Sequence, residues 1–516
     1  MTSTLYLGGR VRTASGAWVD AVLVDGGLIG WLGSAAEARE LSADHRVDAG
    51  GSLLTPAFVD AHVHATAAGL ALSGLDLRQT ASASAALELV EQHARQTRGR
   101  PILGHGWDET VWPEGRPPTR QELDRASYGG VVYLSRVDSH SALASSALLA
   151  SVPDARALTG FAESGWLRQE AHHAVRRAVR DKLPPAQRAA AQRATMQAAA
   201  AAGIGCLHEM AGPDISGADD LRSLLDLAGE EAGPEVIAYW GELGGAETAR
   251  ELGAVGAAGD LFVDGAIGSH TAYLSHDYTD VPTRGALYVD SRELTEHIVA
   301  CGRAGLQAGF HAIGDAALAV LLDNSFPAAA AELGVAQLVA GRHRIEHAEM
   351  ADERCIRRMA EYGIVASVQP AFDAAWGGRD GMYERRLGAE RARSTNPFAA
   401  MAAAGVEMAL GSDAPVTPLD PWGAVRAAAH HQSPGSALSV EAAFDAHTSG
   451  GWRAAGCEPG EGQLAVGRPA TFAVWRAGPA GWAGSLPDLS PGAPAPACLR
   501  TVVRGRIIHD VEGALG

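Results

Sequence analysis

The sequence predicts an α/β fold: a (β/α)8 (TIM) barrel with a small β-sandwich domain formed by both termini and an insertion between barrel strands 1 and 2. Eight strand-like runs alternate with Ala-rich helical runs through the middle of the chain, which is typical of a closed parallel barrel. Short strand-like runs with Gly- and Asp-containing turns occupy both ends of the chain. The interval between the first two barrel strands is too long for one crossover helix.

The two chain ends are expected to form one domain. Residues 1–55 contain the runs STLYLGGRVRT and WVDAVLVDGGLIGWLG, and residues 464–516 contain ATFAVWRAG and RTVVRGRIIHD. Neither piece could bury one face of a sheet alone. A composite β-sandwich of residues 1–55 plus 464–516 is therefore the simplest arrangement.

The barrel domain is expected to span residues 56–463, with an inserted subdomain at about 70–185. Helical runs separate most of the strands, and one of them, ADERCIRRMAEYG, ends at Gly363 as a helix C-cap would. The insertion contains two further strand-like runs, ILGHGWD and VVYLSRVD. The eight predicted barrel strands are 58–64, 205–209, 236–240, 261–264, 307–311, 342–347, 364–369 and 408–413.

Composition limits the classes of partner. The chain has 516 residues, 47% of them hydrophobic, and a net charge of −18 that is spread along the sequence. This charge argues against nucleic acid and anionic membranes as partners, so a small-molecule substrate is the expected partner. Five widely spaced cysteines without a CxxC pair, and an N-terminus without a signal-like apolar run, predict a cytoplasmic protein. The number of subunits stays open, a homo-oligomer included.

Ligand-type side chains stand at the carboxyl ends of the predicted strands, where barrels carry their active sites. His62 and His64 alternate in FVDAHVH and therefore share one strand face, and His311, His347 and Asp413 end three later strands. One strand-end histidine alone is more often a hydrogen-bonded structural residue. Four converging imidazoles and one carboxylate instead predict a site for a divalent cation, with Zn²⁺ as the expected ion.

The motifs PAFVDAHVH, FHAIGDAA, RIEHAE, SVQPAF and ALGSDAPV resemble the amidohydrolase superfamily, and most closely its branch with the N-substituted formamide deformylases. The resemblance covers nearly the whole chain. It implies that His62, His64 and Asp413 hold the more buried metal, while His311 and His347 bind a second ion or flank a single one. Asp413 would also act as general base, and His347, if it is not a ligand, would stabilise the oxyanion of the tetrahedral intermediate.

One position departs from the pattern of that branch. Its fourth strand commonly has a Lys that is carboxylated and bridges two metals, whereas this chain has Asp260 in GDLFVDG. Because an Asp side chain is much shorter, we expect Asp260 not to bridge in the same way. Glu209, in CLHEM, is the first substitute carboxylate to consider, and a hydrogen bond to a ligand histidine is its equal alternative. One metal ion is therefore favoured, with two as the alternative.

The expected activity is metal-dependent hydrolysis of a C–N bond (amide, N-formyl or related) in a small, mostly uncharged substrate, with a water activated by the cation and an Asp general base. Hydrolysis of an ester or lactone, and metal binding without catalysis, are the alternatives. The candidate substrate contacts are Trp107, His140, Ser269, His270 and Gln369. For Trp107, packing in the core of the insertion is an equal alternative.

Overall fold

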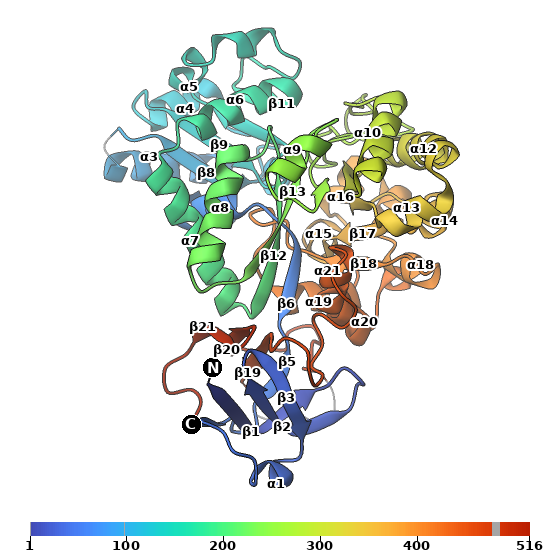
Figure 1. Ribbon diagram of the computed structural model, residues 1–516. Helices are drawn as coiled ribbons and strands as arrows, with labels where there is room; N and C mark the ends of the chain where they lie inside the picture. Colours follow the sequence, from blue (N-terminus) through green and yellow to red (C-terminus); the bar gives the residue numbers. More distant parts are fainter. Residues whose placement is uncertain (1, 98, 477–485) are drawn as a thin grey trace.

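The computed structural model describes residues 2–97, 99–476 and 486–516. They form a central barrel, a sheet domain at its lower end that contains both termini, and an inserted domain that lies beside the upper end of the barrel (Figure 1).

Eight parallel strands form the predicted barrel, in the order β6, β12, β13, β14, β15, β16, β17, β18. Backbone hydrogen bonds join the first and last strands: the Asp413 amide donates to the His62 carbonyl at 2.7 Å, and the His64 amide donates to the Ala414 carbonyl at 3.0 Å. The strands are β6 (Phe58–Val63), β12 (Ile204–Ala211), β13 (Glu235–Trp240), β14 (Gly256–Ala257), β15 (Gln307–Ala312), β16 (Arg344–His347), β17 (Val365–Val368) and β18 (Met408–Leu410). The fold class predicted from the sequence is confirmed.

The predicted fourth strand, 261–264, is wrong. The fourth strand is the two-residue β14, and Phe262 only forms an isolated bridge to His311. Gly259, with φ of 94°, turns the chain just after β14, as glycine does most easily. The Asp264 carboxylate then accepts backbone hydrogen bonds from Tyr273, Ile313 and Gly314 at 2.8–3.0 Å. These backbone partners, two of them just after β15, hold the segment as a loop instead of a strand.

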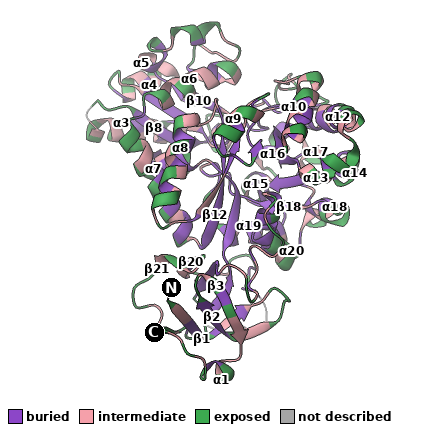
Figure 2. Ribbon diagram, in the orientation of Figure 1, coloured by how far each residue is buried: buried purple, intermediate pink, exposed green. Residues whose placement is uncertain are grey.

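Helices surround the barrel and turn their apolar sides to the strands, so that buried residues line the interior and exposed ones lie on the outer faces (Figure 2). Gly363, with φ of 63°, caps α14 as predicted. The helices are α2 (Ala65–Ser73), α7 (Pro185–Ala201), α8 (Ala218–Glu230), α9 (Ala246–Glu251), α10 (Ser291–Ala304), α11 (Asp315–Ala319), η3 (Val320–Ser325), α12 (Phe326–Leu333), α13 (Val335–Gly341), α14 (Glu353–Tyr362), α15 (Pro370–Trp376), α16 (Met382–Leu387), α17 (Ala389–Arg393), α18 (Phe398–Ala403), α19 (Pro421–Ala429), η4 (Pro434–Ser436), α20 (Val440–Ala446) and α21 (Ser449–Ala454).

The helical run 315–333, made of α11, η3 and α12, has the length and hydropathy of a membrane span. Its Leu318, Leu322 and Phe326 side chains are fully buried in the barrel core. Packing against the barrel accounts for the apolar character of this run.

Strands from both chain ends belong to one continuous sheet, which confirms a separate sheet domain. β5 lies between β1 and β19 and so joins the two ends, and Tyr6 packs edge-on against Phe472 with ring centroids 5.3 Å apart. One short helix, α1 (Ala35–Ala38), flanks the sheet. The strands are β1 (Ser3–Arg12), β2 (Trp18–Asp25), β3 (Leu28–Gly33), β4 (His45–Asp48), β5 (Leu53–Pro56), β19 (Phe472–Trp475), β20 (Cys498–Val503) and β21 (Arg506–Asp510).

The insertion is built on a five-stranded sheet in the order β11, β10, β9, β8, β7. Ion pairs attach it to the barrel loops: Arg386 of α16 donates to Glu109 of the insertion at 2.6 Å, and Glu109 also accepts from Arg136 at 2.9 Å. Its elements are β7 (Leu75–Asp76), α3 (Ala83–Thr97), β8 (Ile102–Trp107), η1 (Glu109–Val111), α4 (Arg120–Ala126), β9 (Val132–Arg136), β10 (Ser141–Ala144), α5 (Ser146–Ala150), η2 (Pro153–Ala157), β11 (Trp166–Arg168) and α6 (Gln169–Asp181).

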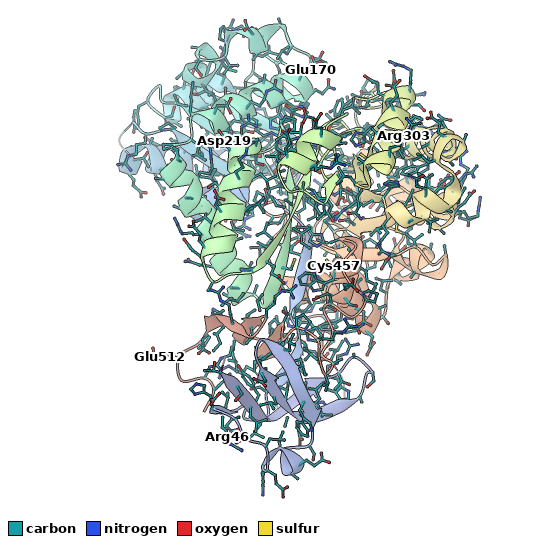
Figure 3. The ribbon with its side chains drawn as sticks, in the orientation of Figure 1. Arg46, Glu170, Asp219, Arg303, Cys457 and Glu512 are labelled. Atoms are coloured by element: carbon teal, nitrogen blue, oxygen red, sulfur yellow. The ribbon has the colours of Figure 1, made fainter. Side chains whose placement is uncertain are left out.

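Charged side chains lie around the outside of all three parts. Arg46 and Glu512 belong to the sheet domain, Glu170 to the insertion, and Asp219 and Arg303 to the barrel helices (Figure 3). The acidic net charge is therefore distributed over the molecule, as the sequence suggests.

Candidate active site

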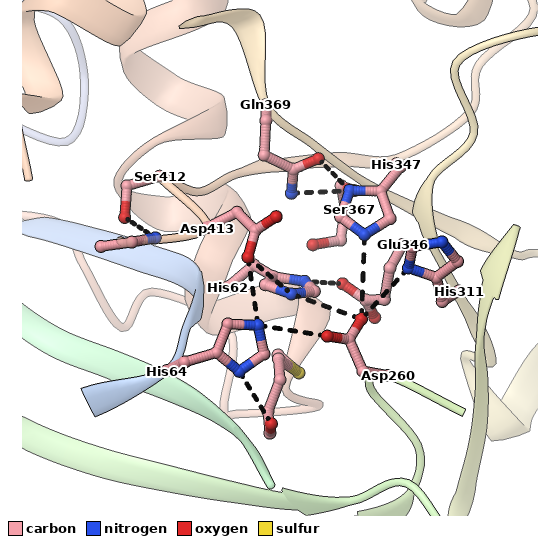
Figure 4. Close-up of polar contacts among 12 residues, drawn as sticks. His62, His64, Asp260, His311, Glu346, His347, Ser367, Gln369, Ser412 and Asp413 are labelled. Carbon is pink, nitrogen blue, oxygen red and sulfur yellow. Dashed lines mark hydrogen bonds and ion pairs between the residues drawn. The ribbon is translucent and has the colours of Figure 1, made fainter. Parts of the chain in front are cut away.

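The barrel brings six ligand-type side chains together at the carboxyl ends of its strands (Figure 4). His62 and His64 come from β6 and the residue after it, and His311 and His347 come from β15 and β16. Asp260 follows β14, and Asp413 follows β18. The five residues that the sequence predicts as metal ligands thus lie in one cluster, to which the structure adds Asp260.

Asp260 lies at the centre of the cluster. Its Oδ1 atom is 3.6 Å from Nε2 of His62, 3.4 Å from Nδ1 of His311 and 3.8 Å from Nε2 of His347, and its Oδ2 atom is 3.1 Å from Nε2 of His64. Asp260 therefore contacts every imidazole of the cluster, while the expectation that it does not bridge two metals as a carboxylated Lys does stays a prediction. Asp260 directly follows the turn at Gly259, and its carboxylate reaches the imidazoles from there.

His62 is fixed by a buried carboxylate. Its Nδ1–H donates to Oε2 of Glu346 at 2.9 Å, and Glu346 in turn accepts from the Arg344 guanidinium at 2.6 Å. This pairing leaves Nε2 of His62 facing the cluster, where it is buried and has no hydrogen bond partner. A carboxylate that orients an imidazole in this way is typical of metal-binding histidines.

Two of the other imidazoles are also held through Nδ1, whereas His311 faces Asp260 with Nδ1 and contacts the Gly265 carbonyl with Nε2 at 3.4 Å. Nδ1 of His64 contacts the Met210 carbonyl at 3.1 Å, and Nδ1 of His347 contacts Oε1 of Gln369 at 2.8 Å. In both rings Nε2 is left to face the carboxylates. Asp413 contributes Oδ1, which lies 3.1 Å from Nε2 of His64 and 3.5 Å from Nε2 of His62.

Among the described residues, two groups of three donor atoms lie close enough to hold one ion each. The first is His62, His64 and Asp413, and the second is His62, Asp260 and His347. A divalent cation fits this arrangement, because Nε2 of His62 and Oδ1 of Asp413 are buried polar atoms without a partner. Nitrogen and carboxylate donors of this kind suit Zn²⁺ and similar ions.

The imidazoles and carboxylates of the cluster each favour the charged form of the other. Burial lowers the pKa of His64, but contact with Asp260 and Asp413 outweighs it and raises that pKa to about 10. Burial acts on Asp260 in the opposite sense, yet the His62 charge and the imidazole contacts hold its pKa well below the usual range. Two carboxylates so placed favour positive charge between them, whether a proton or a metal ion supplies it.

Two of these residues have an unusual backbone. His347 has φ of 71° and Asp413 has φ of 54°, in the left-handed region that non-glycine residues rarely adopt. Such conformations cost free energy and concentrate at functional sites. Here they point side chains from two strand ends toward the same centre.

Glu209 lies outside the cluster. Its Oε2 atom accepts the backbone N–H of Ala65 at 2.8 Å, at the start of α2, and burial raises its pKa to about 7. Through this contact Glu209 holds the first turn of α2 against β12, and it belongs to neither of the two donor groups. Its Oε1 atom is buried without a hydrogen-bond partner and the residue lines the cavity, so the two roles considered from the sequence, substitute ligand and partner of a ligand histidine, stay predictions.

A cavity of about 190 Å³ opens onto the cluster. His64, Asp260, His347 and Asp413 line its inner end together with His140 of the insertion. The His140 ring lies 4.9 Å from that of His311, and burial lowers the pKa of His140 well below the usual value, so its imidazole is neutral. The outer walls are mostly apolar and include Leu70, Leu103, Val179, Leu183 and Ile215.

The four other predicted substrate contacts are not among the lining residues of this cavity. Trp107 is fully buried in the core of the insertion, where its indole N–H donates to the Leu134 carbonyl at 2.9 Å. His270 contacts Asp280 at 3.1 Å, away from the cluster. Gln369 touches His347 instead and orients that ring. Ser269 donates to Asp138 at 2.8 Å and ties the loop after β14 to the insertion.

Sequence reasoning missed two neighbours of the site. Glu346 precedes His347 in RIEHAE, and a buried strand residue of this type, one position before a ligand, is a signal that could have been used. Arg176, on α6, lines the cavity, but nothing in the local sequence distinguishes it from the arginines around it.

Comparison with known proteins identifies the family of the chain. The amidohydrolase family matches residues 46–509. The N-substituted formamide deformylase of Arthrobacter pascens is 26% identical, over 100% of this chain and 99% of its own. The protein LONG AFTER FAR-RED 3 of Arabidopsis thaliana is 27% identical, over 91% of this chain and 86% of its own. A crystal structure of an uncharacterized metal-dependent hydrolase from Pyrococcus horikoshii superposes with a TM-score of 0.75 and 25% identity, over 95% of this chain and 99% of that one. The chain belongs to the amidohydrolase family.

Proposed function

We propose that this protein is a metal-dependent amidohydrolase that hydrolyses a C–N bond, an amide, N-formyl or related group, of a small substrate. The observation that carries the proposal is the convergence of four imidazoles and two carboxylates on one end of a cavity. The apolar outer walls are consistent with a mostly uncharged body of the substrate, as predicted from the sequence.

One ion, most simply Zn²⁺, is proposed. Both donor groups include His62, and only its Nε2 atom is available, because Nδ1 is bonded to Glu346. One ring nitrogen binds one ion, so the described residues do not offer two complete groups at once. His62, His64 and Asp413 would hold the ion, with Asp260 completing the set. A divalent cation there would lower the pKa of water and polarise the bond to be cleaved.

Asp413 is the proposed general base. Its carboxylate lines the cavity beside the proposed ion, where the attacking water would lie. It would accept a proton from the attacking water and return it to the leaving nitrogen, so that an amide and a water become an acid and an amine.

His347 and His140 are the groups placed to act on the substrate. Gln369 fixes the His347 ring, and contact with Asp260 outweighs the effect of burial and raises the pKa of His347. As an imidazolium, His347 would donate from Nε2 to the oxyanion of the tetrahedral intermediate. His140 is neutral and lines the same end of the cavity, where it can hydrogen-bond a polar substrate group.

The test is a panel of N-formyl amines, acyl amides and lactones assayed with the zinc-loaded protein. We expect turnover of C–N substrates, and we expect Asp413→Asn to keep the fold and abolish that turnover. Hydrolysis confined to lactones or esters would move the reaction to C–O bonds, and full activity of Asp413→Asn would remove that residue as base. No turnover of any panel member would contradict the proposal. We further propose that the enzyme acts in the cytoplasm.

A further inference from the structure

The cavity contains one charged group that the proposed reaction does not use. Arg176 lies on α6 and lines the cavity together with Val179, Arg180 and Leu183, which are three, four and seven residues further along the chain. This spacing places one face of α6 and the turn after it along the cavity wall.

Arg176 forms no ion pair among the described residues. Its Nε and Nη2 atoms are buried without a hydrogen bond, and Asp214 and Asp260 favour its charge only from beyond ion-pair distance. Arg180, the other arginine that lines the cavity, is paired with Asp181 at 2.8 Å and donates to the Pro213 carbonyl at 2.6 Å. Burial lowers the pKa of Arg176, as expected for a guanidinium removed from water without an ion-pair partner.

Five acidic residues line the cavity, and none of them forms an ion pair with Arg176. Glu209 accepts from the Ala65 amide through Oε2, while its Oε1 atom has no hydrogen-bond partner among the described residues. Asp138 is paired with Arg136 at 2.8 Å, and Asp220 accepts from Thr66 at 2.9 Å and lies 3.3 Å from Arg188. Asp260 and Asp413 face the imidazoles. None of these contacts neutralises Arg176, so its charge is left for a group that enters the cavity.

We propose that Arg176 binds a carboxylate group of the substrate, so that the substrate is an amide that carries a carboxylate and an apolar side chain. This rests on the proposed hydrolase function and departs from the expectation of a mostly uncharged substrate. A guanidinium presents two parallel N–H donors to a carboxylate, which suits one buried arginine better than a neutral ligand does. The cavity contains both Arg176 and the donor cluster, and Leu103 and Ile215 are among its apolar walls.

The kinetic test uses matched substrates. N-formyl-leucine and N-formyl-leucinamide, in both enantiomers, differ at the carboxyl group, and formate release is measured for each. We expect the wild type to favour the carboxylate at least tenfold in kcat/KM. Arg176→Gln should reduce this preference at least tenfold, mainly through KM, and Arg176→Lys should reduce it less.

Arg177→Gln is the matched control, because Arg177 is exposed on the same helix and paired with Asp214. It should leave the preference unchanged. Equal rates for acid and amide in the wild type, or an undiminished preference in Arg176→Gln, would overturn the proposal.

Binding separates this inference from the proposed function. 4-Methylpentanoate and 4-methylpentanamide are titrated calorimetrically into chelator-treated protein, in which the metal cannot bind the carboxylate. We expect the carboxylate to bind at least tenfold more tightly to the wild type than to Arg176→Gln, whether or not any amide is hydrolysed. Equal binding to both proteins, or binding that requires the metal, would refute a role of Arg176. If no substrate is turned over but the carboxylate binds as expected, the proposed hydrolase function is contradicted and the role of Arg176 is not.

Discussion

Replacing Asp260 by Asn tests the central role that the structure gives to this residue. The amide has nearly the same shape as the carboxylate but no charge, so the change removes an interaction without opening a cavity. Asp260 contacts all four imidazoles of the cluster, at 3.1–3.8 Å. We therefore expect the variant to fold and to bind a divalent ion poorly.

The size of the effect follows from these distances. A charge pair at about 4 Å contributes about 4 kcal/mol at an effective dielectric constant of about 20. Since each 1.4 kcal/mol is about a tenfold change in affinity, loss of the Asp260 charge should weaken metal binding about a thousandfold.

Metal affinity is measured by competition with a chromophoric chelator, and metal content by elemental analysis after dialysis. Glu209→Gln is the matched control. Glu209 is also a buried carboxyl beside the cavity, but it contacts the Ala65 amide and lies outside the donor cluster. Because its pKa is raised to about 7, a neutral amide resembles the form that is populated near neutral pH. Metal affinity of this control should be unchanged.

Two results would refute this reasoning. If Asp260→Asn kept one ion per chain with an affinity within tenfold of the wild type, Asp260 would not contribute to the site. If Glu209→Gln lost the ion instead, the substitute ligand considered from the sequence would be the true one.

Three further changes test other parts of the site. Glu346→Gln should weaken metal binding about 10- to 100-fold, because Glu346 orients His62 through Nδ1, and chelator competition showing wild-type affinity would contradict this. Burial raises the pKa of Asp220 to about 6, above about 3.9 in an unfolded chain, so the stability that it contributes is present below about pH 4 and is lost as the pH rises through 6. We therefore expect Asp220→Asn to gain about 3 kcal/mol of stability relative to the wild type when the pH is raised from 4 to 7. Denaturant titrations of both proteins at the two pH values measure this, and no such gain would argue against the raised pKa. Chelation should lower the melting temperature only modestly, because the barrel core does not depend on the ion, and calorimetry showing complete unfolding would contradict that view.

The sequence by itself determined the barrel and most of the donor set. Alternation along a strand places His62 and His64 on one face whatever lies around them, and parallel barrel strands bring their carboxyl ends to one rim. The positions of His311, His347 and Asp413 follow from these local rules. Periodicity and strand-end position are properties of short segments, so they can be predicted without knowing how distant segments pack.

Only the tertiary structure decided how Asp260, Trp107, His270 and Arg176 are used. Asp260 reaches the cluster because the chain turns at Gly259, which no residue pattern in GDLFVDG indicates. Trp107 proved to be core and His270 to be paired with Asp280, while Arg176 lines the cavity. Whether a polar side chain meets a partner, a cavity or the core depends on segments far away in the chain, and that information exists only once the chain is folded.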